Sequence, residues 1–256
     1  MSIFLKEDDI QKLRQSGNIL AAVLESIKKF IIPGIKTALI DQMAENMIIK
    51  QGARPAFKGY RGFPAALCIS INEQVVHGIP GERIIQDGDL VSIDIGVDYQ
   101  GFFTDAAFSM VAGNRNSVAT QLVEVAKRSL YEGIKNAKIG NRIGDISYSI
   151  QKYIEKNGFT VVRDFVGHGL GRALHEEPQI PNYGYRGQGP LIKNGMVLAI
   201  EPMVNEKGYQ VKVLDDGWTV ITRDGGLSAH YEHSVLITES GPEVLTMNER
   251  GDKENV

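Results

Sequence analysis

Four acidic residues lie inside apolar, strand-like stretches where a carboxylate is not expected, namely Asp94, Asp105, Glu201 and Glu232. No lysine or arginine lies within these stretches to pair with them. Because an unpaired buried carboxylate is strongly penalised, each of the four needs a partner or a metal ion. A salt bridge or a strand end explains any single one, but explains all four together poorly. The set therefore points to a bound cation.

A fifth donor stands in the glycine-rich segment 167–178, which reads Gly-His-Gly-Leu-Gly-Arg-Ala-Leu-His-Glu-Glu-Pro. Glycines on both sides of His168 give the imidazole little packing of its own and let other groups approach closely. A lone histidine in such a loop is often structural or incidental, and the glycine spacing does not match a phosphate-binding loop.

Four carboxylates and one imidazole form an oxygen-rich donor set. Such a set suits Mn²⁺, Fe²⁺, Co²⁺ or Zn²⁺ and differs from a structural zinc site built on thiolates. Two metal ions bridged by carboxylates lower the pKa of a bridging water and stabilise a tetrahedral intermediate. The donor types therefore favour a hydrolase.

Composition and charge narrow the class of protein. The 256 residues are 43% hydrophobic and 23% charged, with a net charge of −3, so no specific nucleic-acid partner is expected. Cys68 is the single cysteine, which excludes an intrachain disulfide and fits a reducing compartment. Acids stand near the N-terminus where a signal peptide needs bases, and no apolar run reaches the ~20 residues of a membrane helix. We expect a cytoplasmic protein that does not contact a membrane.

The donors need elements to position them, and hydrophobic periodicity predicts an α+β fold. A helix is expected up to Ile31, before Pro33-Gly34, and a second helix from Thr37 as N-cap to Gly52. After a loop at 53–64, further helices are expected at about 117–137 and 143–157. The predicted strands are 67–71, 90–95, 102–111, 160–165, 195–204, 209–214, 217–222 and 229–238. Residues 250–256 read as a solvated tail.

The chain also repeats itself at an offset of about 107 residues. Gly34 and Gly52 bracket one predicted helix as Gly140 and Gly158 bracket another, and the segment ending at Asp94 aligns with the one ending at Glu201. Chance similarity between glycine-flanked amphipathic helices is the alternative. The repeat predicts one catalytic domain over 1–249, with related halves at about 10–112 and 117–238. Asp94 and Glu201 would then face each other across the join.

In their order and spacing, the five donors resemble the metal ligands of the short, type I methionine aminopeptidases. The match covers nearly the whole chain, with Asp94 and Asp105 11 residues apart and His168 and His175 7 apart. Glu201 lies in Ile-Glu-Pro and Glu232 in Tyr-Glu-His. The resemblance implies the pita-bread (creatinase/aminopeptidase) fold, with two pseudo-symmetric halves whose antiparallel sheets are covered by helices.

The resemblance also implies the metal site. Asp105 and Glu232 would bridge two divalent metal ions, Asp94 would complete one site, and His168 with Glu201 would complete the other. The family members use Co, Mn, Fe, Zn or Ni, and the sequence leaves the identity open. A hydroxide that bridges the metals would remove the N-terminal methionine of nascent polypeptides when the second residue is small.

Three residues are expected to act on the substrate by the same resemblance. Glu201 would take up and return protons. His175 would stabilise the tetrahedral intermediate, and His77, in Val-Val-His-Gly-Ile-Pro, would hydrogen-bond the scissile amide nitrogen.

The methionine pocket departs in part from the familiar bacterial pattern. Phe57 stands where cysteine is frequent, Phe63 replaces a common tyrosine, and Leu174 stands where phenylalanine is common. The expected lining remains apolar and suits a thioether, although Cys68 alone reads equally well as core. The full expected lining is Phe57, Tyr60, Phe63, Cys68, Leu174 and Trp218. Asn72 and Ser228 match positions that hold a monovalent cation in relatives.

Two other functions stay open. Proline-specific aminopeptidases and dipeptidases share this fold but usually carry an N-terminal domain, which is not expected here. A non-catalytic binding protein of the fold would have lost metal ligands. The long-insert eukaryotic and archaeal type is disfavoured, since His168 and Glu201 are only 33 residues apart. Relatives imply a monomer that meets nascent chains at the ribosome.

Overall fold

The computed structural model describes residues 6–114 and 117–247, so the predicted tail at 250–256 lies outside the described residues. Its helical elements are α1 (Glu7–Lys28), α2 (Thr37–Lys50), the short 3₁₀ turn η1 (Tyr60–Gly62), α3 (Ser117–Asn136) and α4 (Ile143–Lys156). The first eight strands are β1 (Arg54–Pro55), β2 (Leu67–Ile71), β3 (Gln74–Val76), β4 (Leu90–Tyr99), β5 (Phe102–Val111), β6 (Thr160–Val161), β7 (Gly167–Gly169) and β8 (Glu176–Ile180). The remaining strands are β9 (Val197–Ile200), β10 (Met203–Asn205), β11 (Val211–Val213), β12 (Val220–Thr222), β13 (Ser228–His230), β14 (Glu232–Thr238) and β15 (Gly241–Val244).

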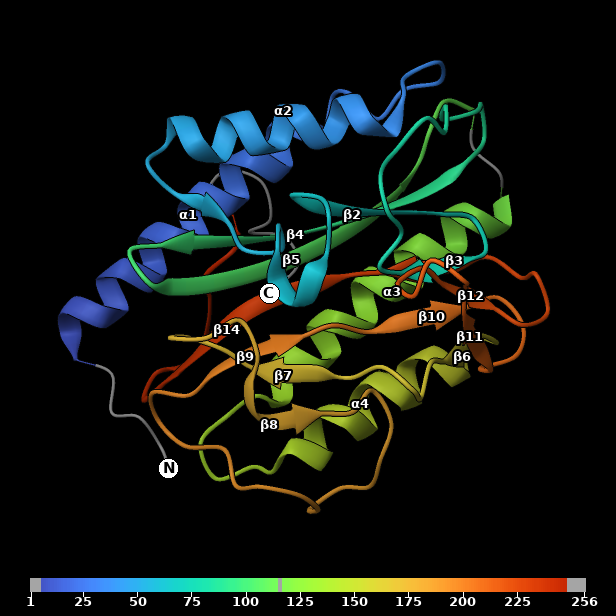
Figure 1. Ribbon diagram of the computed structural model, residues 1–256. Coiled ribbons are helices and arrows are strands. Elements are labelled where there is room, and N and C mark those ends of the chain that lie inside the picture. The colour runs from blue at the N-terminus through green and yellow to red at the C-terminus, as the bar shows by residue number, and fades with distance from the viewer. Residues whose placement is uncertain (1–5, 115–116, 248–256) are drawn as a thin grey trace.

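A nine-stranded antiparallel sheet forms the centre of the molecule (Figure 1). Its strands follow the order β1-β4-β5-β14-β9-β7-β8, with β2 added to β4 and β15 added to β14. Two smaller sheets, β13-β10-β6 and β11-β12-β3, adjoin it. Strands from the two halves of the chain meet at the centre, where β5 pairs with β14.

Strand alternation separates a core face from a second face on the central sheet. On β4, Val91, Ile93 and Ile95 belong to the same hydrophobic core as residues of α1 and α2. Asp94 and Gly96 alternate with them and therefore lie on the opposite face. A second core joins α3 and α4 to β9 and β14. Helices therefore cover one face of the sheet, and the acids lie on the other.

Equivalent contacts recur in the two halves of the chain. A backbone bridge joins Lys36 to Ile84 ahead of α2, and another joins Arg142 to Leu191 ahead of α4. The glycines that flank these helices have positive φ in both halves: Gly34, Gly52, Gly140 and Gly158. These recurrences support the expectation of two related halves.

The predicted helices are confirmed to within a few residues, but one capping detail is wrong. Lys36 is the N-cap of α2, and Thr37 is already helical. The Thr37 hydroxyl donates to the Gly81 carbonyl and accepts from the Gly81 N–H, so it ties the helix to a distant loop instead of capping it. None of the described helices combines the length and hydropathy that a membrane span requires.

The predicted strands are less accurate than the helices. The stretch 195–204 divides into β9 and β10 because Pro202 lacks an N–H for the ladder, and 229–238 divides into β13 and β14 at Tyr231. Only β6 forms within 160–165. Strands β1, β3, β7, β8 and β15 were not predicted. They are two to five residues long, and their pairing partners rather than their own patterns define them.

Candidate metal centre

Strand register brings two predicted donors into one row across the second face of the sheet. Asp94 on β4 lies opposite Ala107 on β5, and Ala107 lies opposite Glu232 on β14. Directly opposed side chains in antiparallel strands have Cβ atoms about 5 Å apart. Because Ala107 is small, it leaves space between the two flanking carboxylates.

A second row lies beside the first. The Asp105 N–H donates to Ser234 Oγ over 2.8 Å, and the Ser234 hydroxyl donates back to the Asp105 carbonyl over 2.8 Å, which joins β5 to β14. Ser234 lies opposite Ala199 on β9, and Ala199 lies opposite His168 on β7. Glu201 follows two residues after Ala199, at the end of β9. Serine and alanine again separate the residues with donor atoms.

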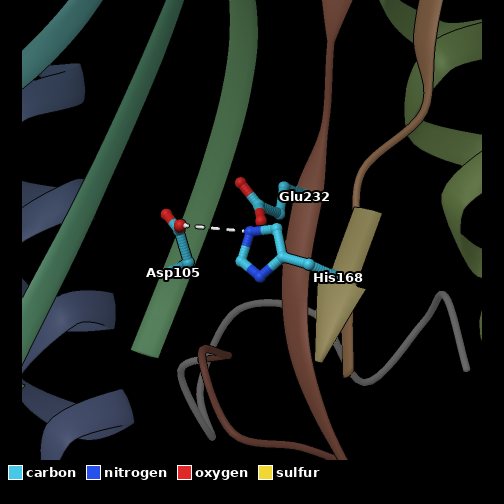
Figure 2. A group of neighbouring side chains, drawn as sticks. All are labelled: Asp105, His168 and Glu232. Atoms are coloured by element: carbon cyan, nitrogen blue, oxygen red, sulfur yellow. Dashed lines mark ion pairs between the residues drawn. The ribbon is translucent and has the colours of Figure 1, made fainter. Parts of the chain in front are cut away.

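Donor atoms of Asp105, His168 and Glu232 lie within 4.8 Å of one another, and all three residues are buried. Figure 2 shows their side chains pointing toward one another from β5, β7 and β14. His168 Nε2 lies 3.5 Å from Glu201 Oε1 and 4.0 Å from Asp105 Oδ2. With Asp94, which the first row places beside them, these residues form the donor cluster: Asp94, Asp105, His168, Glu201 and Glu232.

The orientation of His168 is fixed by the backbone. Its Nδ1 lies 2.9 Å from the Gly169 carbonyl oxygen, to which an Nδ1–H donates. Nε2 then carries the lone pair and faces the carboxylates, which is the tautomer that a metal ligand needs. Burial, with a smaller effect of His175, lowers the pKa of His168 to about 4, so the imidazole is neutral at pH 7.

Among the described residues, no lysine or arginine pairs with the carboxylates of the donor cluster. Asp94 Oδ1, Asp105 Oδ1 and Glu232 Oε1 are buried and have no hydrogen-bond partner among the described residues. Burial raises the pKa of Asp94 to about 7. Burial first, and then the neighbouring carboxylates, raises the pKa of Asp105, Glu201 and Glu232 well above the usual range.

The carboxylates of the donor cluster have buried oxygens without partners and raised pKa values, so their negative charge is not balanced by the side chains around them. A divalent cation supplies the missing charge, and its usual ligands are carboxylate oxygens and neutral imidazoles. The donor cluster therefore fits a metal ion.

A cavity of about 180 Å³ opens over the donor cluster. An apolar cavity of ~150 Å³ holds benzene, so this volume is that of one side chain. The predicted pocket residues all line it, and we call them the pocket wall: Phe57, Tyr60, Phe63, Cys68, Leu174 and Trp218. The rings of Phe63 and Trp218 meet edge to face at 5.1 Å. A Cβ at Gly96 would lie 2.7 Å from the ring of Phe57, so only glycine admits that ring.

The two predicted catalytic histidines also line the cavity. His175 is exposed, and its ring lies 4.1 Å from that of His168 and 5.2 Å from that of Tyr60, on which it stacks. His77 makes edge contacts with Phe165 at 5.6 Å and Trp218 at 6.3 Å. Burial first, and then the neighbouring His175 imidazole, lowers the pKa of His77 to about 4. Burial and the Arg61 charge also lower the pKa of His175.

Asn72 and Ser228 are neighbours. The Ser228 N–H donates to the Asn72 carbonyl over 2.9 Å. The Ser228 hydroxyl is buried and has no partner among the described residues, whereas the Asn72 amide bonds Asp89 and the Leu90 N–H. The unpaired hydroxyl fits a small cation at this position.

Several residues of the site were not predicted. Val76, Phe165, Val166 and Arg61 line the cavity, yet nothing in their local sequence marks them as functional. His230 is buried, with Nε2 4.0 Å from Glu201 Oε2, and neither ring nitrogen has a hydrogen-bond partner among the described residues. Burial, with a smaller effect of His77, lowers the pKa of His230 to about 3. Its position two residues before Glu232 was the only available signal.

Comparisons with known proteins agree with this geometry. The sequence model of metallopeptidase family M24 matches residues 11–239. A methionine aminopeptidase of Clostridium perfringens is 53% identical over 247 residues, which cover 96% of this chain and 99% of the relative. The crystal structure of a methionine aminopeptidase from Thermotoga maritima superposes with a TM-score of 0.95 at 44% identity, over 97% of this chain and 100% of that one. A prolidase from Pyrococcus furiosus, at 24% identity and a TM-score of 0.78, covers 96% of this chain and 65% of its own, and shows the shared fold alone.

Proposed function

The chain belongs to metallopeptidase family M24, has the pita-bread fold and is an aminopeptidase; we propose that it removes methionine from polypeptides whose second residue is small. One observation carries the proposal. Partnerless carboxylates of the donor cluster lie under a cavity that has room for a single apolar side chain. A hydrolytic centre directly beneath a pocket for one residue is what an exopeptidase requires.

The donor cluster would hold two divalent ions, and its five residues would be their ligands: Asp94, Asp105, His168, Glu201 and Glu232. When bound, such ions would supply Lewis-acid chemistry, which would activate a water for attack and polarise the scissile carbonyl. Burial and the charges of Asp105 and Asp94 raise the pKa of Glu201, which suits a group that accepts a proton and then returns it.

His175 and His77 would act on the two ends of the scissile amide. His175 is neutral and its ring is held by Tyr60, so a ring N–H is available to the oxygen that gains negative charge. His77 has φ of +59°, lines the cavity, and makes edge contacts with Phe165 and Trp218 that hold its ring in place. A ring nitrogen of His77 would hydrogen-bond the departing amide nitrogen.

The proposed substrate range follows from the shape of the cavity. The pocket wall offers aromatic faces and the Cys68 sulfur to an unbranched thioether, with which sulfur–aromatic contacts are favourable. The ring stack of Tyr60 and His175 narrows the space beside the scissile bond, so a small second side chain fits best.

Asn72 and Ser228 would hold one monovalent cation. Nascent polypeptide N-termini would be the substrates of a monomeric, cytoplasmic enzyme that contacts the ribosome. The metal that the cell supplies would decide which divalent ion is used.

A peptide panel tests the proposal. Protein stripped of metal and reloaded with Mn²⁺ or Co²⁺ is expected to release methionine from Met-Ala-Ser but not from Met-Lys-Ser, and a chelator should abolish the release. Cleavage of Ala-Pro or other Xaa-Pro peptides with Met-Ala-Ser left intact would replace this proposal with a proline-specific one.

A variant of His175 tests the assignment of roles at the same site. His175→Ala should lower turnover by about 100- to 10,000-fold, the usual contribution of a positioned acid or base, while Mn²⁺ affinity measured by calorimetry changes little. A large loss of Mn²⁺ affinity would show that His175 supports the metals rather than the substrate.

A further inference from the structure

Arg61 is the one arginine or lysine that lines the cavity among the described residues. It is exposed and lies in the middle of η1. Its φ of +49° is in the left-handed region, which side chains other than glycine and asparagine rarely adopt. In Figure 1 the cyan segment that contains η1 passes in front of β4 and β5. The strained backbone turns this cation toward the cavity.

Among the described residues, the Arg61 guanidinium has an aromatic contact but no carboxylate partner. Its central carbon lies 5.4 Å from the centre of the Tyr60 ring, and Tyr60 stacks on His175. Some other arginines pair with acids, as Arg14 does with Glu243 and Arg54 with Asp98. No ion pair links Arg61 to any carboxylate in residues 6–114 and 117–247, and the charge of Arg61 acts on His175. The cavity therefore has one uncompensated positive charge at its exposed rim.

The exposure of the lining residues indicates which side of this cavity is open to solvent. Phe57, Phe63 and Cys68 are buried and close the inner end, while His175 and Arg61 are exposed at the outer end. In the proposed function the first side chain fills the inner end, so the rest of the polypeptide passes the exposed end. Side chains a few ångströms beyond the scissile bond then come within reach of the guanidinium.

We propose that Arg61 is a specificity-determining residue, which favours substrates with a carboxylate side chain at the third position and disfavours those with lysine or arginine there. The inference rests on the proposed function and extends it beyond the second residue. Exposed ion pairs contribute about 1.5- to 5-fold in an equilibrium constant, and attraction and repulsion add when Glu is compared with Lys. A Glu-to-Lys preference of about three- to tenfold in kcat/KM is expected, mainly through KM.

Three matched peptides test the inference on the metal-loaded enzyme: Met-Ala-Glu-Gly, Met-Ala-Gln-Gly and Met-Ala-Lys-Gly. The preference should run Glu over Gln over Lys at low ionic strength. It should largely disappear in 1 M salt, where the screening length is about 3 Å. Arg61→Lys should keep most of the preference, Arg61→Gln should remove it, and Arg61→Glu should reverse it.

Two further variants exclude indirect effects. Arg61→Gly removes the charge and relieves the positive-φ backbone, so it folds at least as well and should behave as Arg61→Gln does. Arg128→Gln changes an exposed arginine on α3, outside the cavity lining, and should keep the wild-type preference. Equal rates for the three peptides, or a preference that survives in Arg61→Gln and Arg61→Gly, overturn the inference. If Met-Ala-Gln-Gly itself is not cleaved, the proposed function fails and the inference fails with it.

Discussion

Two walls of the same cavity, the donor cluster and the pocket wall, differ in what holds them in place. The donors lie on paired strands and at the end of one, where register and the Ser234 hydrogen bonds fix their spacing. The pocket wall comes from the loop that precedes β2, from Cys68 on β2 and from the distant residues Leu174 and Trp218, packed as one apolar cluster. Asp41 of α2 accepts hydrogen bonds from the Ala66 and Leu67 N–H groups and so anchors the end of that loop.

The two walls also contribute to stability with opposite sign. Burial of the pocket wall removes apolar surface from water and stabilises the fold. Burial of the donor cluster crowds carboxylates whose pKa values are raised because no cation lies beside them. Without metal the donor cluster is a strained part of the molecule, and the strands around it hold it in place. The contrast illustrates how a functional site lowers the stability of a fold that its surroundings must support.

The largest effect should come from Asp105→Asn. Turnover of Met-Ala-Ser should fall about 1,000-fold or more, since even residues behind metal ligands contribute about 10- to 100-fold. The free energy of unfolding of the metal-free protein should rise, because the variant removes one of the mutually repelling buried carboxylates. Steady-state kinetics and urea denaturation in chelator measure the two changes.

Asp98→Asn is the matched control for Asp105→Asn. Asp98 is also buried on a central strand, but it is paired with Arg54 and accepts a hydrogen bond from the Gly101 N–H. Its variant should keep turnover and should not gain stability. A metal-free Asp105→Asn protein that is less stable than wild type would contradict the strained-wall interpretation.

The pocket wall should respond in the opposite direction. Phe63 is 4% exposed and packs against Trp218, so Phe63→Ala should lower the free energy of unfolding by about 3 kcal/mol. Part of its ring already faces the cavity, which keeps the loss at the low end for a phenylalanine. Phe63→Leu should lose less than half as much. Urea denaturation in chelator tests the pair, and an unchanged midpoint for Phe63→Ala would show that the loop does not contribute to the core.

The donor cluster should also differ from the pocket wall, by a smaller amount, in how its contribution to stability depends on pH. The pKa of Asp94 is about 7 in the folded protein, whereas the ordinary pKa of an aspartate is 3.8. The contribution of Asp94 to the free energy of unfolding is therefore fully present below about pH 4 and is lost as the pH rises through about 7. In chelator, wild type should lose stability relative to Asp94→Asn between pH 4.5 and 8.5, and saturating Mn²⁺ should reverse the trend. Thermal unfolding of both proteins across this range measures the difference in their stability. A difference that stays constant with pH would refute the prediction.

Much of the site could be predicted from residue types alone. Four acids in apolar strands and a histidine between glycines predicted a metal donor set, and the structure brings all five residues together. The helices were predicted because their periodicity and glycine stops are local properties of the chain. The expected pocket residues line one cavity for a related reason, since the resemblance carried the spatial arrangement with it.

Only the tertiary structure decided how these parts meet. The sequence did not define the short strands β7 and β8, because their hydrogen bonds are made with distant residues. It did not indicate that Ala107, Ser234 and Ala199 separate the donors, since that depends on cross-strand register. Arg61 and His230 had no local signal, because the role of a charged or polar side chain depends on which groups surround it in space. The sequence determined which residues could bind metal, and the folded chain determined which charges are balanced there and which are not.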